Sequence, residues 1–562
     1  MDYLLSKNIT IAIAQLNPTI GDITGNIALA RKAREEAKRQ GAHLILFTEL
    51  FISGYPPEDL IFKTSFIQAC HDAVETLTID TRDNGPGIII GFPRRNQKGI
   101  LNSVAILDAG NIIAIRDKIS LPNYDEFHEK RIFIPGTFND PIEFRGIRIG
   151  ILICEDLWEN ANICKNLQEK GAELLLILNA SPYYRNKLSM RYDMVFQRIS
   201  QIHLPIIYAN QVGGQDELVF DGASFCFNSN HQLAFQMPSF QEQNLMSHWL
   251  YHKSSGWHCT SHIPQSTNTP PESEEADYSA CILGLRDYVH KNHFHKVIVG
   301  LSGGIDSALC ATMAVDALGK DNVRTIMLPY IYTSEQSLED AAACAKALGC
   351  RHDVLSIKNF VDNFFSLMSQ FFEEEVSGIV AENIQSRIRG NILMTISNKS
   401  GEMLLTTSNK SEISVGYGTL YGDMSGGFNP LKDLYKTQVY KLASWRNSHC
   451  ILGGLGPSGE VIPTKILEKS PSAELRPHQK DQDSLPPYSV LDDILECIIE
   501  QEQTLKSIAE KEKYSTEIIH HIENLLYQFE YKRRQSAPGT KITSKSFGRD
   551  RLYPIINQFR EQ

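Results

Sequence analysis

Short apolar runs alternate with longer amphipathic stretches through the first 260 residues. Runs rich in Ile, Leu and Val and bounded by polar residues are typical of β-strands. They lie at Ile9–Gln15, Leu44–Phe47, Ile88–Phe92, Ser103–Leu107, Ile149–Ile153, Leu174–Asn179 and Ile206–Asn210. Stretches with apolar residues three or four apart, such as Asn26–Gln40 and Asn160–Lys170, predict helices between them. Because Ile149–Ile153 and Leu174–Asn179 are apolar on both faces, we expect an α/β domain whose sheets are covered on both sides.

The pattern changes at His262–Glu275, where Ser, Thr, Pro and Glu predict an exposed linker. We therefore expect a first domain at 1–260, a linker at 261–277 and a second domain at 278–562. The second domain starts with strand Lys296–Leu301, a helix at Ser307–Leu318, strand Val323–Leu328 and helix Glu335–Leu348. Strands joined by helices predict a doubly wound parallel sheet. The C-terminal region reads as helical, with a basic tail at Lys532–Arg551.

Composition narrows the class of protein without identifying it. The chain is 42% hydrophobic and 22% charged, as expected of a globular protein. A formal charge of −11 disfavours a broad nucleic-acid-binding face. The eleven cysteines form no Cys-x-x-Cys pair, so we expect neither zinc nor a disulfide framework, and a cytoplasmic location fits them. We expect no signal peptide and no membrane span, because the apolar runs are short.

A glycine-containing turn follows the first strand of the second domain. It reads Gly300-Leu301-Ser302-Gly303-Gly304-Ile305-Asp306-Ser307 and leads into a helix. Glycines let the backbone approach an anion, and the N–H groups and dipole of a helix N-terminus attract one. The turn is neither a Walker A loop nor a dinucleotide-binding G-x-G-x-x-G motif. From the residues alone it is either a phosphate-binding turn or an ordinary turn in which Asp306 caps the helix.

The motif Ser-Gly-Gly-x-Asp-Ser resembles the loop of N-type ATP pyrophosphatases, which cleave ATP to AMP and pyrophosphate. The resemblance implies that Gly300–Ser307 binds ATP and that Asp306 binds Mg²⁺. It does not choose the acceptor, because this family includes GMP, asparagine and NAD synthetases and tRNA-thiolating enzymes.

Further segments are similar to the NAD synthetases of that family. They are Glu382–Gly390, Thr406–Glu412, Tyr421–Asp433, Pro471–Leu475, Asp483–Tyr488 and Pro538–Lys541. The similarity implies that Thr407 and Lys436 bind ATP and that Glu412 completes the Mg²⁺ site. It also implies a deamido-NAD site, made by Asn383, Arg387, Glu412 and Lys541. Leu420 stands where ammonia-dependent synthetases carry a lysine, and in this the chain resembles the glutamine-dependent branch.

Three side chains with useful chemistry follow strands or apolar segments of the first domain: Glu49, Lys118 and Cys154. The carboxyl ends of parallel strands gather at one edge of a sheet, where ligands bind. Glu49 is suited to accept the thiol proton of Cys154 as a general base. Lys118 and the backbone N–H of Glu155 are suited to stabilise the thiolate and the oxyanion. Each residue taken singly is also ordinary for a folded domain.

Their surroundings, Lys118–Phe133, Ile153–Trp158 and Asn179–Tyr184, resemble the nitrilase superfamily and, within it, the glutaminase domains of NAD synthetases. The resemblance implies a four-layer αββα sandwich with Glu49, Lys118 and Cys154 as its catalytic triad. It also implies a supporting role for Glu129, which would orient Lys118. The residues implied to bind glutamine are Tyr124, Ser181 and Lys187, together with Glu129.

The two resemblances together imply a ligase for the last step of NAD biosynthesis. Deamido-NAD, ATP, glutamine and water would give NAD, AMP, pyrophosphate and glutamate. Because free ammonia is largely protonated at neutral pH, we expect a closed tunnel from Cys154 to the Ser302 loop. We also expect a homo-oligomer, either a dimer through the synthetase domains or a larger assembly. The alternatives are amidation or thiolation of another carboxylate or of RNA, and a nucleotide-binding protein with decayed sites.

Overall fold

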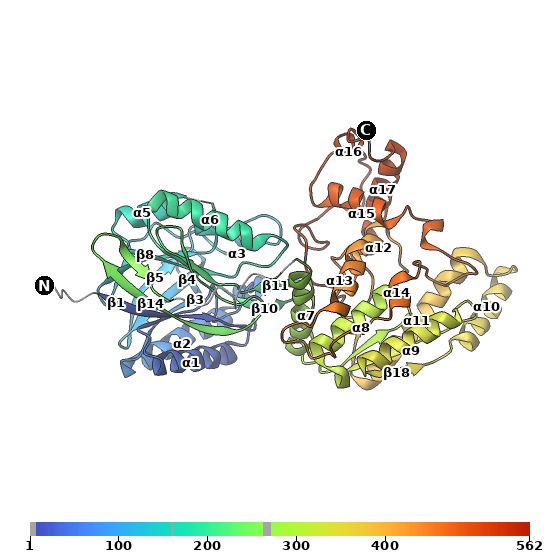
Figure 1. Cartoon of the computed structure of the whole chain (residues 1–562), viewed down its shortest axis with the longest axis horizontal. Helices are drawn as coiled ribbons and strands as arrows, with labels where there is room; N and C mark the ends of the chain where they lie inside the picture. Colours follow the sequence, from blue (N-terminus) through green and yellow to red (C-terminus); the bar gives the residue numbers. More distant parts are fainter. Residues whose placement is uncertain (1–6, 160, 262–270, 272, 562) are drawn as a thin grey trace. The chain divides into compact units, whose positions relative to one another are not determined.

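The computed structural model describes residues 7–159, 161–261, 271 and 273–561 (Figure 1). The chain divides into two compact units, Met1–Gln215 with Val219–Pro271, and Asp216–Leu218 with Glu272–Gln562. Most of the expected linker lies outside the described residues. Helix α7 (Ser273–Lys291) begins inside the range expected for the linker, 261–277, so the last residues of that range are already helical. Within the described ranges, no helix has the length and apolar character needed to cross a membrane.

The first unit contains two large sheets. The seven-stranded sheet has the order β15-β14-β1-β2-β3-β4-β5 and the six-stranded sheet the order β13-β12-β9-β8-β7-β6. The strands of the first sheet are β1 (Asn8–Gln15), β2 (Leu44–Leu46), β3 (Gly87–Arg95), β4 (Ile100–Asp108), β5 (Asn111–Asp117), β14 (Gln243–His252) and β15 (Gly256–Cys259). Those of the second are β6 (Ile142–Phe144), β7 (Ile147–Ile153), β8 (Leu174–Asn179), β9 (Ile206–Asn210), β12 (Phe225–Phe227) and β13 (Leu233–Gln236). A separate pair joins β10 (Val212–Gln215) to β11 (Leu218–Asp221).

The two sheets pack face to face, and helices cover both outer faces. One core joins the sheets through residues such as Ile11 of β1 and Ile149 of β7. A second core lies between the seven-stranded sheet and helices α1 (Ile23–Arg39) and α2 (Thr64–Asp80). A third lies between the six-stranded sheet and helices α5 (Ala161–Glu169) and α6 (Lys187–Ile202) (Figure 1). The expected four-layer αββα sandwich is confirmed.

The second unit is built on a parallel sheet with the order β18-β17-β16-β19. The strands are β16 (Val297–Gly300), β17 (Val323–Met327), β18 (Arg351–Val354) and β19 (Met403–Leu405). Apolar residues of three strands pack against α10 (Lys358–Phe372) and α11 (Gly378–Ser400). Helices α8 (Ile305–Leu318) and α9 (Glu335–Leu348) also contact the sheet, which is therefore flanked by helices as expected.

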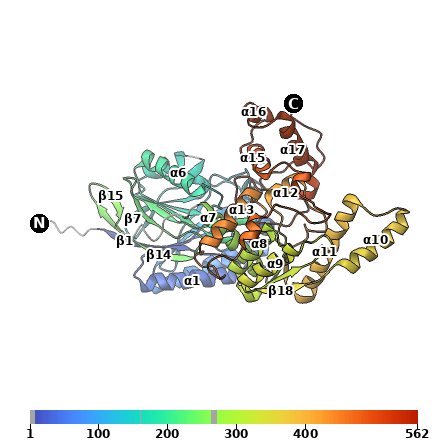
Figure 2. The same ribbon diagram turned by 45° about the vertical axis from the view of Figure 1, so that its right-hand side comes forward.

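The C-terminal part of the second unit is helical, with its own apolar core. Its helices are α12 (Lys410–Val415), α13 (Lys436–Ser448), α14 (Thr464–Glu468), α15 (Tyr488–Ile499), α16 (Leu505–Ala509), α17 (Thr516–Gln528) and α18 (Glu530–Arg533). In both views of the unit, α10 lies at its outer edge, and α15 and α17 lie side by side (Figure 2). Residues after α18 form an irregular strap along this helical part.

Candidate active sites

Cys154 occupies a sharp turn between β7 and the short helix α4 (Glu155–Trp158). Its backbone has φ 44° and ψ −97°, a region that residues with a side chain rarely adopt. Two backbone hydrogen bonds hold the turn: Cys154 N–H donates to Leu178 O at 3.0 Å, and Leu157 N–H donates to Cys154 O at 3.0 Å. The local fold thus holds Cys154 in an unfavourable backbone conformation that places its thiol at the carboxyl end of β7.

Lys118 lies between two buried carboxylates. Its Nζ donates to Glu49 Oε1 at 2.7 Å and to Glu129 Oε1 at 2.8 Å. Glu49 also accepts from Asn102 Nδ2 at 2.8 Å and from the Ala180 N–H at 3.1 Å. The side chains of Lys118 and Glu49 are 0% exposed, so the ion pair is fully removed from water. The structure therefore brings Glu49, Lys118 and Glu129 together in one desolvated cluster.

Electrostatics in this cluster favour a protonated lysine beside a protonated thiol. Burial alone would lower the pKa of Lys118, but the charges of Glu129 and Glu49 outweigh it and raise that pKa well above its ordinary value. Burial, helped by Glu49, raises the pKa of the Cys154 thiol, while Lys118 acts in the opposite direction. Burial also raises the pKa of Glu129 to about 7 against the opposing charge of Lys118. A resting thiol of this kind needs a base to remove its proton.

The residues expected to bind glutamine lie around the same cluster. Ser181 is buried, and its Oγ accepts from Arg191 Nε at 3.2 Å. The half-exposed Tyr124 donates from its hydroxyl to Glu155 Oε2 at 2.9 Å. Burial, followed by the charge of Glu155, raises the pKa of Tyr124. The Cys154 sulfur is among the groups that interact electrostatically with both Tyr124 and Lys187, so both lie near the nucleophile.

Lys187 sits at the start of α6 in an aromatic cradle. Its Nζ lies 4.5 Å from the ring centroid of Trp158 and 4.8 Å from that of Tyr184. Burial, followed by the nearby Arg191 charge, lowers the pKa of Lys187 to about 8. This ammonium therefore loses its charge as the pH rises through about 8.

Sequence reasoning missed several buried polar residues that support this site. Tyr55 donates from its hydroxyl to Glu129 Oε1 at 2.9 Å, and Asn102 donates to Glu49. Arg191 is fully buried and binds both carboxylate oxygens of Asp221 at 2.8 Å. A fifth residue, Asp156, lies in the segment Ile153–Trp158 that resembles the nitrilase superfamily, and this resemblance could have identified it. Nothing in the local sequence pattern distinguishes Tyr55, Asn102, Arg191 or Asp221.

The turn at Gly300–Ser307 opens into a cavity of about 450 Å³ in the second unit. Eleven of the expected residues line it: Gly300, Leu301, Ser302, Gly304, Ile305, Asp306, Ser307, Asn383, Thr407, Glu412 and Lys436. Gly303 does not line it, but its φ of +80° and a Cβ position only 2.4 Å from Ser337 O require glycine there. The N-cap of α8 is Gly304, which has no side chain. Its free first-turn amides are suited to an anion.

Asp306 and Glu412 share one ammonium group. Lys436 Nζ lies 2.5 Å from Asp306 Oδ2 and 3.3 Å from Glu412 Oε1. Asn409 donates to Asp306 Oδ1 at 2.9 Å, and its side chain also caps α12 in a box with Glu412. Asp306 is therefore engaged with residues from other elements, which argues against the reading of it as a helix cap.

Burial shapes the charges of this second cluster too. It raises the pKa of Glu412 to about 8, with Lys436 opposing and Asp306 reinforcing the shift. Burial would lower the pKa of Lys436, but Asp306 and Glu412 outweigh it and raise that pKa. Two acids that hold one lysine at the wall of a cavity form a group that an added cation can rearrange.

Two of the expected deamido-NAD residues lie outside the cavity lining. Arg387 is exposed on α11 and donates from Nε to Leu420 O at 3.2 Å. Lys541 is buried in the C-terminal strap and pairs with Asp550 at 2.9 Å. Conversely, the cavity contains Arg389, which sequence reasoning missed although it lies in the recognised segment. Its Nε donates to Leu328 O at 2.9 Å, and burial lowers its pKa to about 10.

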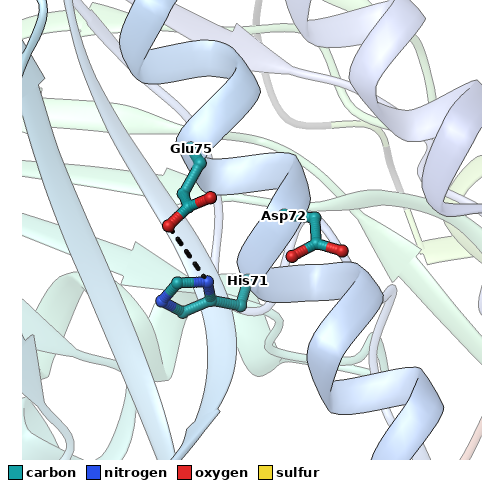
Figure 3. Close-up of side chains that lie close together, drawn as sticks. All are labelled: His71, Asp72 and Glu75. Atoms are coloured by element: carbon teal, nitrogen blue, oxygen red, sulfur yellow. Dashed lines mark ion pairs between the residues drawn. The ribbon is translucent and has the colours of Figure 1, made fainter.

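A separate group with metal-like spacing lies on the exposed face of α2. His71, Asp72 and Glu75 have ligand atoms within 4.8 Å of one another. His71 Nδ1 lies 3.6 Å from Glu75 Oε1, and Figure 3 shows the Glu75 carboxylate turned toward the ring. Asp72 instead accepts from Gln68 at 2.8 Å. All three are exposed, and pairs of this kind are common on solvated helix faces, so we assign them no metal.

Comparisons with known proteins cover both units. Residues 10–248 match the carbon-nitrogen hydrolase family, and residues 278–536 match the NAD synthase family. The chain is 43% identical over 558 residues to a glutamine-dependent NAD(+) synthetase from Rhodobacter capsulatus, covering 99% of this chain and 100% of that one. It is 39% identical to the enzyme of that name from Thermotoga maritima, covering 99% and 100% of the two chains.

Solved structures give the same picture. A glutamine-dependent NAD⁺ synthetase from Acinetobacter baumannii in complex with ADP has a TM-score of 0.77 and 38% identity, covering 99% of this chain and 100% of that one. A glutamine-dependent NAD(+) synthetase from Cytophaga hutchinsonii shares the fold with a TM-score of 0.80 at 21% identity, covering 98% of each chain. With relatives of this identity matched over nearly their whole length, the chain belongs to the family of glutamine-dependent NAD(+) synthetases.

Proposed function

We propose that this protein is a glutamine-hydrolysing ligase that converts deamido-NAD to NAD with ATP, releasing AMP, pyrophosphate and glutamate. The observation that carries the proposal is the buried Lys118 pair with Glu49 and Glu129 beside a strained Cys154. The same chain holds a nucleotide-sized cavity at the Ser302 turn. A nitrogen source and an activated acceptor are the two components that amide formation requires.

In the first unit, Glu49 takes the thiol proton and the Cys154 sulfur attacks the side-chain amide carbon of glutamine. The Lys118 ammonium and the Glu155 N–H stabilise the oxyanion of the tetrahedral intermediate. Glu49 returns the proton to the leaving nitrogen, so ammonia departs and a glutamyl thioester remains. A water molecule, deprotonated by Glu49, then attacks the thioester and releases glutamate with the free thiol.

Glutamine recognition is assigned to the polar groups around this cluster. Ser181 Oγ accepts from Arg191, and its hydroxyl is assigned to donate to an acceptor on the ligand. Lys187 supplies a positive charge suited to the α-carboxylate. Glu129 Oε2 accepts no hydrogen bond from the described residues and suits an N–H donor, and Tyr124 closes the site from its exposed side.

In the second unit, the deamido-NAD carboxylate attacks the α-phosphorus of ATP, and pyrophosphate leaves. Free amides at the start of α8 and the Lys436 ammonium hold the phosphates, while Thr407 contacts the nucleotide. Ammonia then attacks the acyl carbon of the adenylate, and AMP leaves. Asn383 and Glu412 line the cavity toward deamido-NAD. Arg387 follows Ser386, a lining residue, and Lys541 reaches the substrate only after leaving Asp550.

Mg²⁺ is assigned to Asp306 and Glu412. Carboxylate oxygens are the donors that Mg²⁺ prefers, and it usually takes one or two of them together with substrate phosphates. Both side chains are partly open, at 17% and 15% exposure, and both now hold the same ammonium. Bound there with ATP, the ion would neutralise phosphate charge as pyrophosphate leaves.

We further propose a cytoplasmic homo-oligomer. Eleven cysteines are free, with nine of them buried, which suits a reducing compartment. The oligomer is supported by an apolar face on α10 and the start of α11. Its exposed residues include Phe360, Leu367, Phe371, Phe372 and Ile379. An exposed apolar patch of this kind is typical of an interface between copies.

The test is a split assay on Cys154→Ala. We expect NAD formation from glutamine to disappear, while formation from a high concentration of ammonium chloride persists at the wild-type rate. Asp306→Ala is the matched variant in the second unit and should lose both nitrogen routes. If Cys154→Ala, still folded, lost the ammonia route as well, the division of labour would be refuted.

A further inference from the structure

One carboxylate ties together the two chain segments that carry the nucleophile and the catalytic lysine. Asp156 Oδ1 accepts from the N–H of Ile119 at 2.9 Å and from that of Ser120 at 2.8 Å. These residues directly follow Lys118. Asp156 Oδ2 accepts from the N–H of Ile153 at 3.1 Å, and Ile153 directly precedes Cys154. The two oxygens thus hold opposite sides of the site.

The position of Asp156 suits this bridging role rather than a helix cap. It is the second residue of the four-residue helix α4, and its side chain turns back toward β7. It is only 3% exposed. The adjoining cavity, of about 10 Å³, has space for no more than about one water molecule, too little to replace both carboxylate oxygens. Because buried N–H groups must be paired, the three amides depend on this side chain.

Both segments need such a tie. The Cys154 turn has a positive φ, and a strained conformation persists only where its surroundings restrain it. The backbone of Lys118 is held on its other side, where its N–H donates to Asn102 O at 2.8 Å. That contact fixes Lys118 to β4 and not to the Cys154 turn. Asp156 supplies a direct link between the lysine and the nucleophile segments.

We propose that Asp156 is a positioning residue for glutamine hydrolysis. It sets the separation between the Lys118 ammonium and the Cys154 sulfur without touching the substrate. The inference rests on the proposed glutaminase function of the first unit. A displacement of about 1 Å between reacting groups can cost about 100-fold in rate, so even a small relaxation of these segments should be visible in kcat.

The first test compares Asp156→Asn with Asn166→Ala. Asparagine keeps the size of the side chain but replaces one acceptor oxygen by an N–H₂ group, which cannot accept from a backbone N–H. We expect kcat for glutamine hydrolysis to fall about 30- to 100-fold, with KM within about threefold and the ammonia-dependent rate unchanged. Asn166 lines the same small cavity, so Asn166→Ala controls for general loosening and should change kcat less than twofold. A kcat near wild type in Asp156→Asn, or a loss that falls on KM, would overturn the proposal.

The second test follows the thiol without glutamine turnover. Alkylation of Cys154 by iodoacetamide, read on its peptide by mass spectrometry, should slow about tenfold in Asp156→Asn and not in Asn166→Ala. Unchanged alkylation in Asp156→Asn would count against the positioning role. A wild-type protein that hydrolysed no glutamine but gave this pattern would refute the proposed function and leave the positioning role standing.

A third test of the positioning role uses the wild-type protein, so it does not depend on whether a variant folds. Amide hydrogen exchange should place Ile119, Ser120 and Ile153 among the slowest amides of the first unit, because all three donate to one buried carboxylate. Fast exchange at either segment in the native state would show that Asp156 does not hold it. That result would overturn the proposal even if Asp156→Asn failed to fold.

Discussion

Each unit places one lysine between two acids, yet the two clusters differ in how open they are. Lys118 and Glu49 are 0% exposed and Glu129 is 5% exposed. In the second unit Lys436 is 3% exposed, but Asp306 and Glu412 are 17% and 15% exposed and line a cavity of about 450 Å³. In the first cluster the lysine and both acids are already paired and removed from solvent. The second has carboxylate oxygens that solvent or a cation can reach.

This difference matches the chemistry proposed for each. Covalent attack on an amide needs a base and an oxyanion donor that are already in place, because reorganisation would add to the barrier. Transfer from ATP needs a site that binds a large polyanion and changes its ion pairs as it does so. In the proposed mechanism, a similar triad of charges would serve as a fixed catalyst in one unit and as an adjustable phosphate-binding site in the other.

The largest expected effect is that of Lys118→Gln. Removing an oxyanion donor costs about 100- to 1,000-fold in kcat, and two carboxylates would be left facing each other. We expect glutamine-dependent synthesis to fall about 1,000-fold and the first unit to lose about 3–5 kcal/mol of unfolding free energy, as for a broken buried ion pair. Steady-state assays and urea denaturation measure both. Wild-type stability in this variant would mean that the cluster is not as desolvated as the structure indicates.

Lys436→Gln, compared with Lys118→Gln, should show most clearly how the two clusters differ in the activities they support and in their cost to stability. We expect both the glutamine and the ammonia routes to fall about 100-fold, because a phosphate contact is lost from the shared site. The cost in unfolding free energy should be smaller than for Lys118→Gln, about 1 kcal/mol, since water reaches the two acids left behind. If the two lysine variants destabilise the protein equally, openness does not distinguish their clusters.

The third effect, about tenfold, concerns the pH dependence of glutamine binding. The pKa of Lys187 is lowered to about 8, so its charge is present below pH 8 and is lost as the pH rises through that value. The KM for glutamine should therefore rise about tenfold between pH 7 and pH 9, while the KM for ammonia, corrected for its own protonation, lacks this step. Lys187→Arg stays charged and should flatten the rise. A step that persists in Lys187→Arg would assign it to another group.

The sequence predicted the strands of the first unit well, because short apolar runs are a local signal, and the family resemblance supplied their four-layer arrangement. The structure brings Glu49, Lys118 and Glu129 together, while the catalytic roles of the triad stay a prediction. Supporting residues such as Tyr55 and Asn102 gave no such signal, since a buried polar residue looks ordinary until its partner across the fold is known.

In the second unit, motif order placed eleven residues around one cavity. It could not place Lys541, because the path of an irregular strap depends on distant contacts such as that with Asp550. Nor could composition locate the start of α7, since the Ser-Glu-Glu segment at Ser273 is equally typical of a linker and of a first helical turn.

The smallest expected effect is that of Tyr55→Phe. It tests whether the first cluster depends on each of the hydrogen bonds that hold its buried acids in place. The variant removes one hydrogen bond to Glu129 Oε1, which Lys118 also uses. Loss of one buried bond costs about 1–1.5 kcal/mol, so kcat for glutamine should fall about fivefold to tenfold.

The same variant should also change the pH dependence of glutamine hydrolysis. Negative charge on Glu129 is part of what raises the pKa of Tyr55, so without that hydroxyl the carboxylate loses a donor that favours its ionised form. The pKa of Glu129 should then rise above about 7, and the acid limb of the kcat profile should move to higher pH. Tyr488→Phe, which removes a 2.8 Å bond to Asp481 at the second cavity, is the matched variant and should leave that limb unmoved. A limb that stays fixed in Tyr55→Phe would show that Lys118 alone determines the state of Glu129.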